Sequence, residues 1–260
     1  MNKVLLPIGI IPCLLASVCV RAAVDLPPAE RLLEDVRARL PQNPLLIKGE
    51  LKVRKRKGIV VKTFGFKSFL HLDFRRPVAV YTIRDGNGKR LEELSVERNS
   101  AGMASYRYIN GDSEGVSKTP PLFSPVQGTD LSWADLTLSF LWWREGRTVG
   151  EDTVKGRQCY VVEVIPPDNA LRPGGEEGDR PVYKKVKLWV DRKLRMILQA
   201  EGYGRDGEIM RRLWIRSLKK VDDQWMIKQM EVASFPALYR TRLCIGEVEA
   251  AADYDFDSGN

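Results

Sequence analysis

Hydrophobic and polar residues alternate along most of the chain. The alternation is clear in LIKGELKVR, VVKTFGF, FLHLDF and VAVYTIR, which are residues 46–54, 60–66, 69–74 and 78–84. A period of two is typical of antiparallel strands that have one buried and one solvated face. The same period returns in six later segments, at residues 159–165, 182–191, 196–203, 208–218, 225–235 and 238–248. The pattern therefore predicts about ten strands.

Turn residues separate these segments at hairpin intervals. DGNGK at 85–89, RDGE at 205–208 and VDDQ at 221–224 each lie between two alternating runs, and such residues are typical of tight turns. The segment Pro166–Pro181 is rich in proline, glycine and acid, so we interpret it as an exposed hairpin loop rather than a linker. The strands thus form a meander. A sheet of this size curls, and its concave face must be filled or occupied.

Two segments have helical spacing instead. Residues 27–42 carry an apolar stripe, and the middle segment GTDLSWADLTLSFLWW, residues 128–143, holds three of the six tryptophans. In the middle segment Ser132 and Asp135 have the spacing of a capping box, which predicts a helix that starts at Ser132. This helix is apolar nearly all round, so it is buried or lies against lipid. The stripe of the first helix consists of Leu32, Leu33, Val36 and Leu40.

These elements predict an α+β fold. Its core is a single strongly curved antiparallel sheet, an incomplete β-barrel of about ten strands, with the N-terminal helix and the middle helix covering the concave side. No boundary divides the chain after its N-terminal region, so we predict one domain over residues 24–260.

The first 23 residues have the pattern of a secretory signal peptide. Lys3 precedes an uncharged apolar run, Val4–Val20, and the sequence Val20-Arg21-Ala22 that follows resembles a cleavage site. We predict cleavage near Ala22 or Ala23, which places the mature protein in the periplasm or outside the cell. Two alternatives stay open: an uncleaved N-terminal anchor, and a lipoprotein signal ending at Cys19, which the large Val18 disfavours.

The charge of the chain changes this picture little. Removal of the signal takes away Lys3 and Arg21 and no acid, so the formal net charge falls from +8 to +6. The densest basic clusters are RKRK at 54–57 and YKKVK at 183–187. Because basic and apolar residues alternate there, we interpret them as the solvated face of a sheet, and binding of lipid headgroups is the alternative. A signal peptide argues against nucleic acid as a partner.

Reactive motifs are missing from the sequence. It contains no nucleophile elbow, P-loop or dinucleotide fingerprint. The one histidine, His71, lies in a strand-like run without a marked catalytic partner, and it forms no zinc set with Cys159 and Cys244. Both cysteines lie in strand-like runs, so we interpret each as a small buried residue. A disulfide between them is the alternative, because the compartment is oxidising. We therefore expect no enzymatic activity, no metal and no cofactor.

The later part of the chain resembles a known family. The order SPVQGTDLSWADL and FLWW, then VKGRQCYVVEVIPP, KVKLWVDRKLRM, AEGYGRDGEIMRR and WMIKQMEV with TRLCIGEVE, is similar to the LolA-like outer-membrane lipoprotein-sorting family. The resemblance covers most of the mature chain and is strongest from Ser124 onward. It implies a strongly curved antiparallel sheet with helices at the mouth of an incomplete barrel. The loop at Pro166–Pro181 has no counterpart that we can place in the family.

The resemblance also implies a function. A periplasmic carrier of this kind binds acyl chains of lipoproteins or lipids in an apolar cavity, for sorting to the outer membrane. Its partners are the acylated lipoprotein or lipid and transport components of the inner and outer membranes. The family has an arginine before a proline that helps to close the helical lid, and Arg76 before Pro77 matches it. The residues of the middle helix expected at the ligand are Trp133, Leu136, Phe140, Leu141, Trp142 and Trp143.

Two alternative functions stay open. An RseB-like envelope sensor built on the same sheet would bind lipid or lipoprotein and pass the signal to a protein partner. A structural envelope protein would use the same trough only as core.

Overall fold

The computed structural model describes residues 25–55, 57–73, 77–99, 102–111, 116–117, 122–167, 183–221, 223–236 and 239–251. The predicted signal peptide and most of the predicted loop at 166–181 lie outside these residues. The helices are α1 (Ala29–Arg37), the 3-10 turn η1 (Val126–Gly128), α2 (Trp133–Leu136) and the 3-10 turn η2 (Ser139–Trp142). Among the described residues, no helix is long and apolar enough to span a membrane.

The described strands form one sheet. They are β1 (Leu45–Lys55), β2 (Val60–His71), β3 (Val78–Arg84), β4 (Arg90–Arg98), β5 (Ala104–Asn110), β6 (Val116–Ser117), β7 (Gly146–Val154), β8 (Arg157–Val164), β9 (Lys185–Asp191), β10 (Ile197–Tyr203), β11 (Ile209–Val221), β12 (Gln224–Ser234) and β13 (Tyr239–Ala250). Their order in space is β6-β5-β4-β3-β2-β1-β13-β12-β11-β10-β9-β8-β7. Two meanders therefore meet where the first strand pairs with the last.

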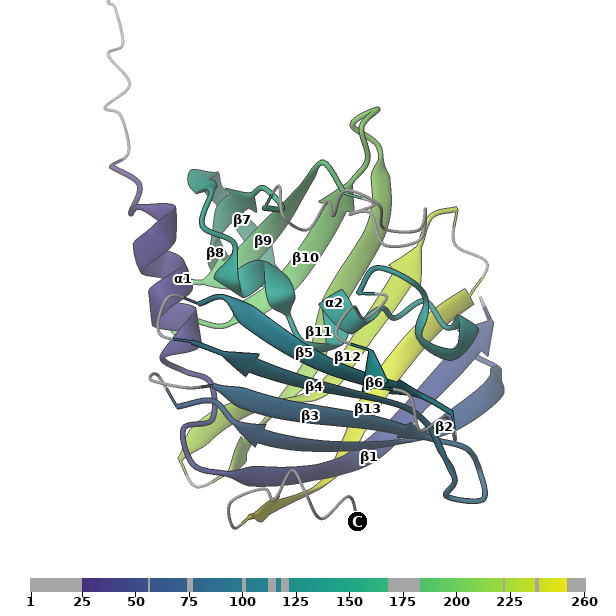
Figure 1. Cartoon of the computed structure of the whole chain (residues 1–260). Helices are drawn as coiled ribbons and strands as arrows, with labels where there is room; N and C mark the ends of the chain where they lie inside the picture. Colours follow the sequence, from purple (N-terminus) through teal and green to yellow (C-terminus); the bar gives the residue numbers. More distant parts are fainter. Residues whose placement is uncertain are drawn as a thin grey trace, which may run out of the picture.

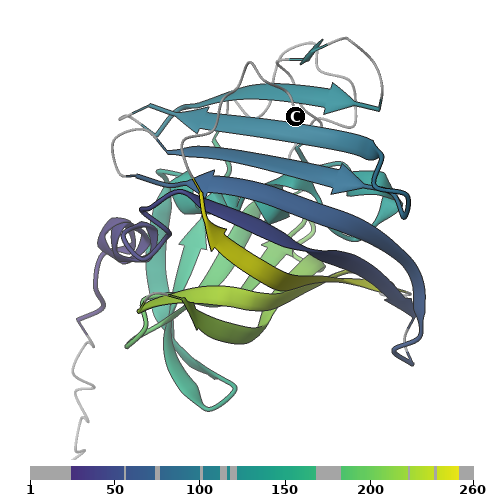
Figure 2. The same cartoon turned by 90° about the horizontal axis from the view of Figure 1, so that it is seen from below.

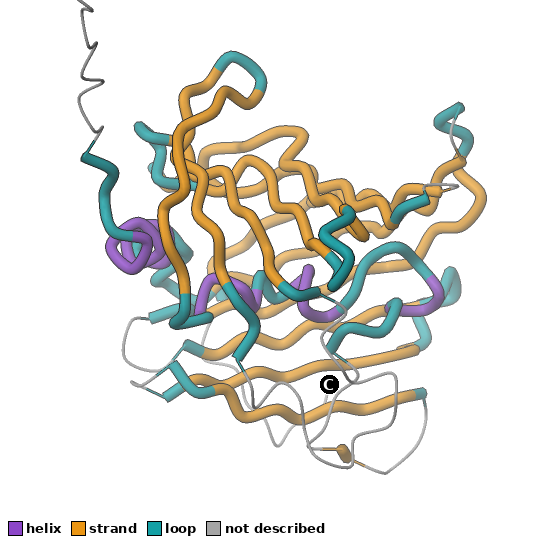
Figure 3. The backbone as a smooth tube through the Cα atoms, turned by 90° about the horizontal axis from the view of Figure 1, so that it is seen from above, coloured by secondary structure: helices purple, strands orange, loops and turns teal. Residues whose placement is uncertain are grey.

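The sheet curls into an open half-barrel, as the sequence predicts (Figure 1, Figure 2). Each pair of neighbouring strands is antiparallel. Strands β6 and β7 stand at the two edges, and the chain between them, residues 118–145, carries η1, α2 and η2. We call residues 126–143 the helical segment. It lies inside the curve of the sheet (Figure 3).

The prediction of about ten strands is too low, because the described sheet has thirteen. The runs at 60–66 and 69–74 belong to a single strand, β2. The strands missed by the pattern are β4, β5, β6 and β7. Most residues of β7 are exposed, and β4 has charged residues on both faces. Neither strand therefore shows a regular alternation of apolar and polar residues.

The junction of the two meanders depends on a glycine. Strands β1 and β13 pair over their whole length, with a register shift between Lys48 and Gly49. A Cβ atom at Gly49 would lie 2.3 Å from the carbonyl oxygen of Cys244, closer than any side chain tolerates. Glycine at this position therefore lets the first and last strands approach, which joins the two meanders into one sheet.

Helix α1 follows the predicted stripe. Leu32, Leu33 and Val36 are buried, and Leu40 follows the end of the helix and packs against the same core. The helix lies beside the edge strand β7 and the turn η2 (Figure 1). It therefore closes one side of the half-barrel that the sheet alone leaves open.

The middle helix begins at the predicted N-cap. Ser132 accepts from the amide of Asp135, and the carboxylate of Asp135 accepts from the amide of Ser132, which completes the capping box. The helix is shorter than the apolar run predicts, because it ends at Leu136 and Leu138 takes a left-handed conformation with φ of 47°. The chain then continues as η2. Packing inside the curved sheet, rather than helical propensity, determines the path of this segment.

The convex face of the sheet carries ion pairs. Glu231 is 2% exposed and accepts hydrogen bonds from Arg216 and Arg242, the latter at 2.8 Å between Nε and Oε2. Burial acts to raise the pKa of Glu231, but the hydrogen bonds from the two arginines outweigh it and lower that pKa below its ordinary value.

This lowered pKa predicts an acid-sensitive contribution to stability. A carboxylate with a depressed pKa stabilises the fold above the pKa of the unfolded chain, about 4.3 for glutamate, and that contribution is lost as the pH falls through the folded pKa. Replacing Glu231 with glutamine should lower the free energy of unfolding by about 1–3 kcal/mol at neutral pH. Urea unfolding at pH 7 and pH 3 measures this. An equal difference between variant and wild type at both values would contradict it.

Candidate functional site

An apolar cavity lies between the concave face of the sheet and the helical elements. Its volume is about 150 Å³, roughly ten times the space that one water needs. The wall formed by the helical elements consists of Val36, Arg39, Leu40, Leu136, Thr137, Leu138, Leu141 and Trp142. The sheet supplies the opposite wall, so the cavity is enclosed by parts of the chain that are distant in sequence.

The sheet wall follows the period of two. Phe66, Ser68 and Leu70 of β2 point into the cavity, and so do Leu213 and Ile215 of β11, because alternate residues share one face of a strand. Strands β1, β3, β4, β10, β12 and β13 contribute Ile47, Ala79, Tyr81, Val96, Arg98, Ile197, Met226, Ile227, Met230, Leu243 and Ile245. The lining is mostly aliphatic and carries few polar groups.

A buried carboxylate holds the helical segment against β4. Glu92 is 6% exposed, and its oxygens accept from the hydroxyl of Tyr108 at 2.8 Å, from the side-chain amide of Gln127 at 2.6 Å and from the indole of Trp133 at 3.2 Å. The backbone amide of Gln127 donates to it as well, at 3.1 Å. These bonds attach η1 and α2 to the wall of the cavity.

An ion pair attaches α2 to the other meander. Arg211 of β11 donates to the carboxylate of Asp135 at 2.7 Å, and both side chains are largely buried. Burial acts to lower the pKa of Arg211, but the charge of Asp135 outweighs it and raises that pKa. The side chain of Tyr183 also forms a hydrogen bond with Arg211. The ring of Tyr183 lies over Gly202, and a Cβ atom at that position would come within 2.5 Å of the ring.

Two further arginines contact η2. Arg37 of α1 donates to the carbonyl of Leu141 at 2.6 Å, and burial lowers the pKa of its guanidinium. Arg98 at the end of β4 lies over the ring of Trp142, 4.3 Å from its centre. The sequence pattern did not predict these roles for Arg37, Glu92, Arg98 and Arg211. For Arg98 the sequence did contain a signal. Arg98 lies two residues after Val96, so the period of two places a charged residue on the apolar face of the strand.

The predicted ligand residues fall into two groups. Leu136, Leu141 and Trp142 line the cavity. Trp133, Phe140 and Trp143 are buried in the core beside it, the last two as an edge-to-face pair with ring centres 6.5 Å apart. Arg76, the predicted lid-closing residue, lies outside the described residues, although Pro77 after it lines the cavity.

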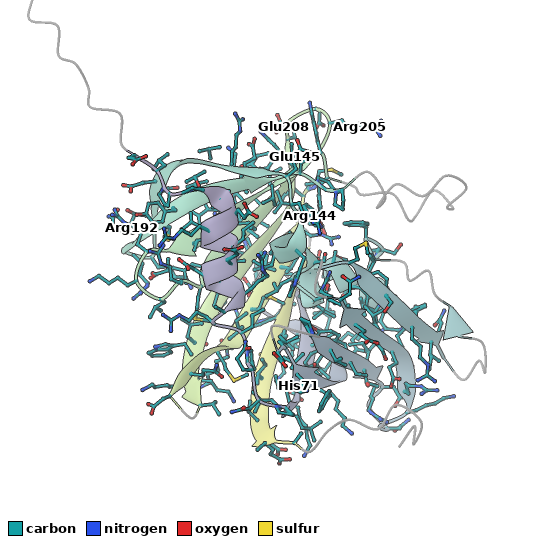
Figure 4. The ribbon with its side chains drawn as sticks, turned by 60° about the vertical axis from the view of Figure 1, so that its left-hand side comes forward. His71, Arg144, Glu145, Arg192, Arg205 and Glu208 are labelled. Atoms are coloured by element: carbon teal, nitrogen blue, oxygen red, sulfur yellow. The ribbon has the colours of Figure 1, made fainter. Side chains whose placement is uncertain are left out.

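The reactive side chains His71, Cys159 and Cys244 are not part of the cavity lining. His71 follows the cavity-lining Leu70 on β2 and lies well below Arg144 and Glu145 in Figure 4. Cys159 and Cys244 are both free, and burial raises the pKa of the Cys159 thiol to about 11, which keeps it protonated at neutral pH. Within the described ranges, no group of three or more His, Cys, Asp or Glu side chains could hold a metal ion.

Comparisons place the chain in a family and give its fold. A family model described as "Uncharacterized protein" matches residues 115–258, and the chain belongs to that family. No curated protein matches the sequence. The predicted resemblance to LolA-like proteins is confirmed for the fold, because solved structures of that group superimpose on most of this chain.

Three solved structures illustrate the likeness. A DUF1329 family protein from Desulfovibrio piger has a TM-score of 0.69 at 16% identity and covers 87% of this chain and 93% of its own. A putative outer membrane lipoprotein-sorting protein domain from Vibrio parahaemolyticus has a TM-score of 0.68 at 14% identity and covers 88% of this chain and 96% of its own. A LolA superfamily protein from Nitrosomonas europaea has a TM-score of 0.64 at 11% identity and covers 88% of this chain and 96% of its own. At these identities the likeness concerns the fold.

Proposed function

We propose that this protein is an exported carrier that holds acyl chains of lipoproteins or lipids in the cavity between its curved sheet and its helical segment. The observation that carries the proposal is the cavity itself, whose walls are mostly aliphatic. The likeness in fold to a putative outer membrane lipoprotein-sorting domain supports it. Such a carrier performs no chemical reaction, and it needs only a site that excludes water and a way to release its cargo.

The apolar walls supply the affinity. Each methylene group that leaves water contributes about 0.8 kcal/mol, so an acyl chain binds without polar contacts. Release requires the helical segment to move away from the sheet. The hydrogen bond from Arg37 to Leu141 and the contact between Arg98 and Trp142 are the attachments of η2 that have to break.

Extraction of lipid tests the proposal directly. The protein is purified without detergent, denatured and extracted, and the extract is analysed by mass spectrometry. In parallel, the lipid-free protein is titrated with a fluorescent fatty acid. We expect acyl species in the extract and saturable binding of the probe. The absence of both would overturn the proposal.

Replacing Trp142 with alanine should weaken binding of the fluorescent fatty acid by roughly tenfold, because the ring forms part of the cavity wall. The measurement is a fluorescence titration of each folded variant. Trp143 is the matched control, since it is 8% exposed and packs in the core beside the cavity. Its replacement should lower stability more than affinity. An unchanged affinity of the Trp142→Ala variant would argue against this wall as the binding surface.

Export is the second part of the proposal. It rests on the predicted signal at residues 1–23, and the periplasm is the compartment in which we place the mature chain. N-terminal sequencing of the protein from a periplasmic extract tests it. A first residue near Ala23 is expected, whereas a chain that still begins at Met1 in the membrane fraction would indicate the uncleaved anchor.

A further inference from the structure

The cavity contains one feature that an acyl carrier does not need: a buried cation. Arg98 is 6% exposed and lines the apolar cavity. Arginine is almost never buried to this degree unless an acid accompanies it. Removing a guanidinium from water destabilises the folded state unless an opposite charge and hydrogen bonds compensate. The partners of Arg98 therefore indicate the role of this residue.

The partners of Arg98 within the described residues are all uncharged. Its guanidinium lies on the ring of Trp142, donates to the carbonyl of Gly102 at 3.3 Å and bonds Tyr106. The other charged or titratable groups that act on it are Tyr81 and Arg37. None of the described carboxylates forms an ion pair with it.

Arg211 shows how the same protein treats an arginine with a structural role. It is also largely buried, and Asp135 neutralises it at 2.7 Å. Among the described residues Arg98 has no such acid, and burial lowers the pKa of its guanidinium. Burial of the guanidinium among apolar side chains therefore disfavours its charge. An anion that enters the cavity would supply the missing compensation.

The rest of the cavity determines what kind of anion fits. Val96 lies on the same face of β4 as Arg98, and Leu213, Ile215 and Leu243 form aliphatic wall beyond it. A small inorganic anion would leave these walls without a partner. A molecule with one anionic end and a hydrocarbon chain satisfies both the guanidinium and the walls.

Resting on the proposed function, we propose that the cavity selects acyl ligands with an anionic headgroup, a carboxylate or a phosphate, which pairs with Arg98 while the chain lies along the aliphatic walls. Guanidinium binds both groups through paired hydrogen bonds. The ligand is therefore a fatty acid or an acyl phosphate lipid rather than a neutral acyl compound.

Three probes with the same chain test the headgroup: myristate, tetradecyl phosphate and the neutral tetradecanol. Each displaces a fluorescent fatty acid from the wild-type protein at neutral pH. We expect at least one anion to bind about tenfold or more tightly than tetradecanol, as a buried charge-assisted hydrogen bond predicts. The stronger of the two anions identifies the source, a fatty acid or a phospholipid.

Variants of Arg98 assign the preference to this residue. Arg98→Gln should lose the preference for the anion over tetradecanol, and Arg98→Lys should restore part of it. Arg39 is the matched control, because it also lines the cavity but is exposed to solvent. If Arg39→Gln abolished the preference and Arg98→Gln kept it, the assignment would be wrong.

A measurement on the wild type keeps the test independent of how well the variants fold. The carboxyl resonance of ¹³C-labelled myristate is followed by NMR as the pH is lowered. Pairing with Arg98 should lower the pKa of the bound carboxyl below that of the free acid. Burial in an apolar cavity without a cation would raise it, and a raised value would overturn the inference.

The outcomes separate the two proposals. If none of the three probes binds, the carrier function itself fails. If all three bind with equal affinity, the carrier function stands and the headgroup inference is overturned.

Discussion

Replacing Trp133 with alanine is expected to lower the free energy of unfolding by about 3–5 kcal/mol. The side chain is fully buried, its ring packs edge-on against Tyr108 with centres 6.3 Å apart, and its indole donates to Glu92. Its removal leaves a cavity and takes one donor from a buried carboxylate, and both effects destabilise the folded state. Urea unfolding of the lipid-free protein, followed by circular dichroism, measures the change.

Trp225 provides the control for Trp133. It is 43% exposed, so its replacement with alanine removes the same atoms from a site that water already reaches. We expect this variant to lose much less stability than Trp133→Ala. Similar losses in the two variants would mean that α2 is not anchored through Trp133.

Replacing Asp135 with alanine is expected to cost about 3–5 kcal/mol as well, because it leaves the buried guanidinium of Arg211 without its counter-ion. The capping box is lost in the same step, since the carboxylate of Asp135 also accepts from the amide of Ser132 at 2.9 Å. Equilibrium unfolding in urea gives the difference. The loss should exceed that from Glu231→Gln, whose arginine partners are better exposed to solvent.

A double variant tests the reason for this loss. Arg211→Met combined with Asp135→Ala removes the uncompensated charge, so it should be more stable than Asp135→Ala alone. The double-mutant cycle then gives the coupling between the two side chains. If the two losses simply add, the ion pair does not hold α2 to β11, and the cost of Asp135→Ala comes from the cap alone.

The helical segment is attached unequally along its length. Around α2, Glu92 and Asp135 are buried and accept several hydrogen bonds each. At η2 the polar attachments are the bond from Arg37 to Leu141 and the stacking of Arg98 on Trp142. An opening of the cavity at η2 therefore breaks fewer polar contacts than one at α2.

The sequence alone indicated much of the fold but undercounted its strands. The alternation in β1, β3 and β9 to β13 was readable because one face is apolar and the other polar. Strand β7 was missed because an edge strand exposed on both faces has no apolar period. In β4, Glu92 and Arg98 occupy inward positions, so the residues that hold the helical segment and line the cavity also obscured the pattern.

The candidate site was predicted only in part. The apolar middle segment and its N-cap were readable, because a capping box is a local signal in the sequence. Which of its side chains face the cavity was not, since Leu138 turns the chain through a left-handed conformation after only one turn of helix. Because of this break, Leu141 and Trp142, which line the cavity, do not point in the directions that a continuous helix would give them.

The class of fold, the meander of strands and the start of the middle helix can be predicted from the sequence, because all three depend on local periodicity and on hydrogen bonds between near neighbours. Long-range packing sets the pairing of β1 with β13, the partners of Glu92 and Asp135, and the burial of Arg98 in an apolar cavity without an ion pair to a described carboxylate. Each of these joins residues that are far apart in the chain, and their energies come from burial and charge compensation, which no local pattern records.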